Sequence, residues 1–149
     1  MRTGITITIA FAMFTMSACS LFGSGGDPLE VLRYEVLSKV QDEERAEAML
    51  ADIDKLDELL SESAELLADA ARQERALFVN YDSTPQDFEA LFAEASRKRH
   101  DLRGAMLDVH LEFKAKATAE EWSAILPIHA SAISARVNSL VAAAIDERG

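Results

Sequence analysis

The sequence predicts an all-α protein, a bundle of three to four helices over residues 28–149. Ala, Leu, Glu, Asp, Lys and Arg dominate the chain, a usage typical of long helices. After Gly26, the helix-breaking residues are few: Gly104, Gly149, Pro28, Pro85 and Pro127. Apolar residues also recur at helical spacing. We expect an antiparallel helical hairpin completed by a third helix that Pro127 bends.

The first helix start lies at the stretch "DPLE". Asp27 can cap a helix, and Pro28 suits the first helical position because it needs no backbone N–H donor there. The segment 28–40 has its own apolar set. It either continues into the next helix or breaks between Ser38 and Asp42, and no Gly or Pro decides between the two.

The hairpin is predicted from two long apolar stripes, in residues 42–80 and 85–116, with a turn over 81–84. Thr84 can cap the second helix, with Pro85 in its first position. Both stripes have a spacing near 3.5 residues, which favours helices packed at a shallow angle. We expect Leu60 and Leu67 to contact the stretch from Ala95 to Leu102.

Charges support the same pairing. In the antiparallel register, the basic run from Arg97 to Arg103 faces the acidic run from Glu62 to Asp69, and Lys114 and Lys116 fall close to Asp52. The alternative is that these charges are solvated, with each exposed pair contributing about 0–1 kcal/mol. Gly104 falls opposite Ser61, where two small residues would permit a close helix approach.

The last helix begins at "TAEE", where Thr118 and Glu121 can form a capping box. Pro127 lies well inside this helix and removes one backbone hydrogen bond, so a kink or an interruption is expected there. The bend would let Trp122, the only tryptophan, pack in the core.

The amino terminus has the parts of a secretory signal peptide: a positive start, a short apolar run and small residues. The run from Ile5 to Met16 is shorter than the roughly 20 residues that a transmembrane helix requires.

The residues Met16, Ser17, Ala18 and Cys19 resemble the lipobox of bacterial lipoproteins. The resemblance implies that lipid is attached to Cys19 and that the chain is cleaved before it. It divides the chain into a signal peptide (1–18), a lipidated flexible linker (19–27) and a helical domain (28–149). Ser20 resembles the residue that directs such proteins to the outer membrane. The alternative is a free or intermolecularly bonded thiol, because no second cysteine exists in the chain.

The charge of −11 excludes phosphate backbones as natural partners, so no nucleic acid is expected. No nucleophile–base constellation, nucleotide-binding loop or metalloprotease motif is present in the sequence. We therefore expect a protein that is not an enzyme and that carries no cofactor.

Three histidines remain as candidate ligands. Met106 and His110 stand four residues apart on one helix, and this sulfur and imidazole pair suits copper or nickel. The simpler alternative is a surface histidine. His129 lies on the apolar stripe of the last helix, where a core histidine is the commoner occupant.

The signal sequence, the long hairpin and "KATAEEW" before the last helix resemble the periplasmic heavy-metal-sensor and envelope-stress chaperone proteins. Those proteins carry a Leu-Thr-x-x-Gln motif, of which this chain keeps Thr118 but has Ala117 and Glu121 at the Leu and Gln positions.

These observations predict a membrane-anchored periplasmic lipoprotein that acts as a binding, scaffold or chaperone-like module. Its partners would be the membrane, through the lipid, and another envelope protein. The alternative is a periplasmic metal-sensing or metal-buffering protein. An apolar segment at 28–40 either covers the protein's own core or supports a homodimer.

Overall fold

A computed structural model describes residues 27–146 and is all-helical, with no strand in that range. Its helices are α1 (Pro28–Lys39), α2 (Glu43–Val79), α3 (Pro85–Lys116) and α4 (Ala119–Asp146). In this part of the chain, no helix is both long and apolar enough to cross a membrane. The predicted signal peptide, Cys19 and most of the linker lie outside the described residues.

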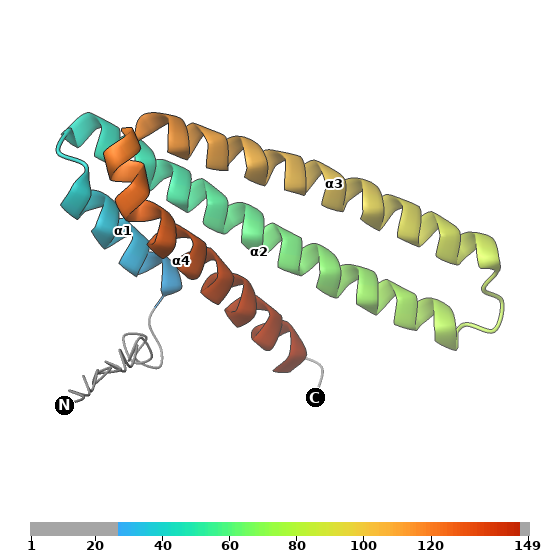
Figure 1. Cartoon of the computed structure of the whole chain (residues 1–149). Helices are drawn as coiled ribbons and strands as arrows, with labels where there is room; N and C mark the ends of the chain where they lie inside the picture. Colours follow the sequence, from blue (N-terminus) through green and yellow to red (C-terminus); the bar gives the residue numbers. More distant parts are fainter. Residues whose placement is uncertain (1–26, 147–149) are drawn as a thin grey trace, which may run out of the picture.

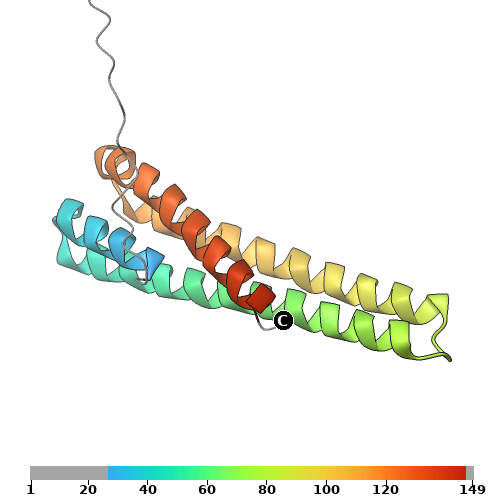
Figure 2. The same ribbon diagram turned by 90° about the horizontal axis from the view of Figure 1, so that it is seen from below.

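The four helices divide the molecule into two regions. The long helices α2 and α3 lie side by side in opposite directions, and both α1 and α4 pack beside them at one end only (Figures 1 and 2). We call that end the four-helix body. The remainder, residues 62–104, consists of the far parts of α2 and α3 and the loop between them, and we call it the two-helix arm. Arg136 of α4 reaches only its edge, where it donates to the Ser61 hydroxyl.

The core lies in the body. The larger cluster joins α1, α2, α3 and α4 through Leu29, Leu32, Val36, Val40, Ala46, Met49, Ile53, Phe113, Ile125 and Ala132. A smaller cluster of Leu56, Leu60 and Val109 continues it along α2 and α3, with Ile133 and Leu140 of α4 packed against it. No side chain from Ser61 to Asp101 is fully buried.

The sequence did not decide whether residues 28–40 continue into the next helix. In the structure they form a separate helix, α1. Asp27 caps α1, since its carboxylate accepts the Leu29 N–H at 3.0 Å. The chain then breaks over residues 40–42, and Asp42 caps α2 by accepting the Arg45 N–H at 2.9 Å. Val40, in the break, is buried in the core, so packing of the connection stabilises the change of direction.

The predicted starts of α3 at Thr84 and of α4 at Thr118 are also confirmed. Thr84 donates from both its backbone N–H and its hydroxyl to the Asp87 carboxylate, at 2.8 Å each. At α4, the Thr118 N–H donates to Glu121 at 2.7 Å, and the Glu121 N–H donates back to the Thr118 hydroxyl at 3.2 Å. These reciprocal bonds satisfy N–H groups that a helix start leaves without partners.

Helix α4 is a single helix with Pro127 inside it, so the chain is not interrupted there. Trp122 packs against the larger core cluster but is only partly buried. Its ring meets Phe113 edge-on, with the ring centroids 6.2 Å apart.

One expectation about α3 is wrong: Gly104 is exposed, and a Cβ built there would meet nothing within 4 Å, so it does not mark a close helix approach. The charge register is confirmed in part, because Lys98 of the basic run lines one surface hollow together with Glu62, Glu65 and Asp69. Arg97 instead pairs with Glu94 and Asp101 of its own helix, because neighbours three and four residues away share its exposed face. The expected proximity of Lys116 to Asp52 is confirmed, at 2.5 Å.

Candidate functional site

The two-helix arm carries several exposed apolar side chains, although Leu107 and Leu111 of α3 are exposed in the body as well. Leu67 and Phe92 are each 50% exposed along its length, and Phe78, Val79 and Tyr81 are more exposed still near its tip. Two helices can bury only the seam between them, so the flanks of that seam remain in solvent. The flanks are hollowed, one on each side of the seam.

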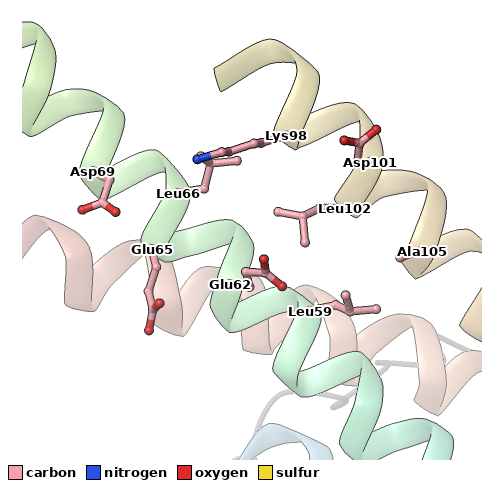
Figure 3. Close-up of a pocket in the computed structure, with 9 residues that line it drawn as sticks. All are labelled: Leu59, Glu62, Glu65, Leu66, Asp69, Lys98, Asp101, Leu102 and Ala105. Atoms are coloured by element: carbon pink, nitrogen blue, oxygen red, sulfur yellow. The ribbon is translucent and has the colours of Figure 1, made fainter. Parts of the chain in front are cut away.

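One hollow, of about 500 Å³, is acidic and appears in Figure 3. We call it the acidic hollow; its lining comprises Leu59, Glu62, Glu65, Leu66, Asp69, Lys98, Asp101, Leu102 and Ala105. Leu59 and Leu102 point into the gap between the helices, and Lys98 reaches from α3 toward Leu66 (Figure 3). Glu65 and Asp69 point away from α3. The apolar floor is therefore narrow and partly covered by Lys98.

The other hollow, of about 560 Å³, is more apolar. We call it the phenylalanine groove; it is lined by Leu66, Leu67, Ala70, Ala71, Glu74, Phe92, Ala95, Ser96 and Arg99. At 100° per residue, these positions fall on the opposite side of the seam from those of the acidic hollow. Toward the tip, Phe78 and Phe88 contact each other, with ring centroids 5.0 Å apart. Leu67 and Ala95, expected to lie near each other, line the same groove.

The phenylalanine groove continues the surface that α4 covers in the body. On α3, Phe113, Met106, Arg99 and Phe92 recur every seven residues, so they share one face. Phe113 contacts His129 of α4, and Met106 packs in the cluster that contains Ile133 and Leu140. Arg99 and Phe92 lie farther along the same face, past the part that α4 covers.

The apolar stripe on α2 also continues from the body into the arm. Met49, Ile53, Leu56 and Leu60 are buried in the body, and alternating steps of three and four residues lead from them through Ser63 to Leu67, Ala70 and Glu74. Helix α4 ends partway along α2 (Figures 1 and 2). The groove is thus the part of a continuous helix-binding surface that lies beyond α4.

His110, the histidine predicted as a ligand, and His129, expected as a core histidine, lie together at the joint of α3 and α4. His110 is half-buried, and its ring centroid lies 5.0 Å from that of His129 and 5.7 Å from that of Trp122. Met106, the other predicted ligand, packs among apolar side chains of the smaller cluster. No group of three or more His, Cys, Asp or Glu side chains in the described range is arranged to hold a metal ion.

His129 is 4% exposed, which identifies it as a core histidine. Burial is the main cause that lowers the pKa of His129 to about 4, and the charge of nearby His110 is the second. The imidazole is therefore neutral near pH 7 and packs as an aromatic ring between Phe113 and Trp122.

An ion pair closes the end of the body. The Arg45 guanidinium donates to both carboxylate oxygens of Glu121, at 2.8 and 3.0 Å, and also to the Lys116 carbonyl oxygen at 2.8 Å. The hydrogen bond from Arg45, together with that from the Thr118 N–H, lowers the pKa of Glu121 to about 2. One guanidinium thus links α2, the end of α3 and the start of α4. Nothing in the sequence spacing of Arg45 and Glu121 pointed to this pair.

Comparison of the chain with family models, with curated proteins and with solved structures found no match.

Proposed function

We propose that the protein is a membrane-anchored periplasmic lipoprotein that acts as a binding or scaffold module, with the two-helix arm as its partner-binding part. The observation that carries the proposal is the uncovered arm. It extends past the ends of α1 and α4 with half-exposed Leu67 and Phe92 along its side. Contiguous apolar surface of this kind is typical of interaction sites.

The proposed anchor is lipid on Cys19, placed at the outer membrane. Several acyl chains give essentially permanent attachment, at about 0.8 kcal/mol per buried methylene. In this proposal, a short linker joins the lipid to α1, the body supplies stability, and the arm reaches the partner. The proposal keeps the arrangement expected from the sequence, an antiparallel hairpin completed by a helix that bends at Pro127. A chaperone-like role would use the same surface for unfolded clients.

The test is site-specific photo-crosslinking of the full chain in a Gram-negative envelope. A photoreactive residue replaces Phe92 on the arm or, as a matched control, Tyr34 on the exposed face of α1. The proposal expects a discrete envelope-protein adduct from position 92 and none from position 34. Adducts from position 34 alone, or none from either, contradict it. Cys19→Ala should release the chain from membranes, and mass spectrometry should find acyl mass on Cys19.

A metal-sensing or metal-buffering protein is the second candidate, and the proximity of two imidazoles favours it. His110 and His129 have ring centroids 5.0 Å apart, and Met106 precedes His110 by one turn. Calorimetric titration with Cu²⁺ or Ni²⁺ tests this alternative. It expects stoichiometric binding that His110→Ala abolishes; heats indistinguishable from buffer would exclude it.

A further inference from the structure

We propose that the phenylalanine groove binds an amphipathic α-helix over about two turns, which extends the path of α4 and presents a basic residue to Glu74. This inference rests on the proposed binding function and names the site and the class of ligand. The acidic hollow on the other side of the seam is not part of the site.

The first argument is that the chain itself shows how a helix sits on this surface. In the body, α4 packs on the α2–α3 face through apolar residues, among them Ile133 and Leu140. The same face continues past α4 as the phenylalanine groove. A second helix can therefore pack there by the contacts that α4 already makes: large side chains into the seam, polar side chains toward solvent.

The size and shape of the phenylalanine groove also fit a short helix. From Leu66 to Glu74 the groove follows α2 over about 12 Å, at 1.5 Å per residue. Its floor has small side chains at Ala70, Ala71 and Ala95, which permit a close approach of another helix. Its walls carry Leu67 and Phe92, each half-exposed and placed to pack against the side of such a helix.

The charged side chains in the phenylalanine groove also favour a helical ligand. In the body, Arg136 of α4 binds Asp57 of α2, with Nε and Oδ1 2.6 Å apart. In the groove, α2 again contributes a carboxylate, Glu74, and α3 contributes the Arg99 guanidinium. Among residues 27–143, neither forms an ion pair. A ligand helix with a Lys or Arg facing Glu74 and an acid facing Arg99 would pair both.

The net charge favours a different protein over a second copy of this chain. At −11, two copies repel each other, whereas a basic helix is attracted toward the arm. Self-association is nevertheless one of the outcomes that the experiment distinguishes.

The probes are two fluorescent helical peptides of about four turns that share one Leu/Ala face. They differ only in carrying Lys or Glu at the position expected to face Glu74. Each is titrated by anisotropy against the full lipidated chain in nanodiscs. We expect the Lys peptide to bind about tenfold more tightly, since one close charge pair changes affinity by that order.

Three variants locate the site. Glu74→Lys should reverse the preference, and Phe92→Ala should weaken both peptides at least about tenfold. Glu65→Lys, the same charge reversal on the acidic hollow, should leave the tenfold preference unchanged. All three positions are at least partly exposed, and circular dichroism confirms that each variant remains helical.

Several results would overturn the assignment. One is a preference for the Lys peptide that survives Glu74→Lys or disappears in Glu65→Lys. Another is sedimentation showing a dimer that Phe92→Ala dissociates, because a second copy would then occupy the groove. If position 92 crosslinks to an envelope protein while neither peptide binds, the binding function stands and the assignment of a basic helix to the groove fails. Crosslinks confined to the body contradict the binding function itself.

Discussion

The body and the arm are made from the same two helices, yet they differ in what those helices bury. In the body, α2 and α3 share their apolar stripes with α1 and α4, and Leu32, Met49 and Ile125 lose all contact with solvent. In the arm, the stripes continue but only the seam is covered, and Phe92 on the continuing stripe remains 50% exposed. The difference shows that burial depends on how many helices meet at a position. An apolar stripe alone does not determine it.

The sharpest test of this comparison replaces the same residue type in each region. Phe113→Ala removes a side chain that is 2% exposed in the body, and Phe92→Ala removes one that is 50% exposed in the arm. We expect losses in the free energy of unfolding of about 4 kcal/mol for Phe113 and about 1 kcal/mol or less for Phe92. Urea denaturation followed by circular dichroism measures both. Equal losses would mean that the arm is as tightly packed as the body.

The second test changes pH. The pKa of His129 is lowered from 6.5 to about 4 by burial, so between these values the unfolded chain binds the proton more readily than the folded one. The stabilisation is complete above pH 6.5 and decreases as the pH falls toward 4. It amounts to roughly 2–3 kcal/mol over that range. Unfolding free energies at pH 7 and pH 4.5 should differ less in His129→Leu than in the natural chain. An unchanged difference would show that His129 is solvated.

The third test addresses the ion pair that joins the body helices. Glu121→Gln keeps the size of the side chain but removes the charge that Arg45 contacts at 2.8 and 3.0 Å. The Glu121 side chain is 12% exposed, so we expect a loss of about 2 kcal/mol, since a partly buried guanidinium loses its charged partner. Thermal unfolding measures it. If the melting temperature did not change, Arg45 would have found another acceptor.

The smallest effect is expected for an ion pair on the arm. Arg97 contacts Glu94 and Asp101, but its side chain is 60% exposed and all three residues lie on one helix. Arg97→Ala should leave the free energy of unfolding unchanged within the error of the measurement, because exposed ion pairs contribute little. The same denaturation experiment checks it, and Arg97→Lys serves as control. A loss of the size expected for Glu121→Gln would show that the arm charges stabilise the pairing of α2 with α3.

Sequence reasoning identified the helix starts well because caps are local. Asp27, Thr84, and Thr118 with Glu121 each act within three residues of themselves, so their roles can be read without knowing the rest of the molecule. The apolar stripes could be predicted equally well, since they follow from helical periodicity. The caps and the stripes together predicted the all-helical class.

The candidate site was much harder to predict from the sequence than the helix starts were. Met106 and His110 were singled out for their spacing, but the structure pairs His110 with His129 of another helix and packs Met106 among apolar residues. The groove residues Leu67 and Phe92 lie on stripes that are continuous with buried positions, so periodicity alone does not distinguish them from core residues. Their half-exposure depends on which helices pack on them in the described structure.

By itself, the sequence determined which segments are helical, where α1, α3 and α4 begin, which face of each long helix is apolar, and the strongly acidic charge. Each of these depends on a residue and its near neighbours along the chain. Tertiary structure decided that α1 is separate from α2, that Arg45 binds Glu121 across 76 positions, that Gly104 marks no close contact, and that part of the apolar face lacks a covering helix. These features depend on the lengths and crossing of four helices in space, and local periodicity carries no information about either.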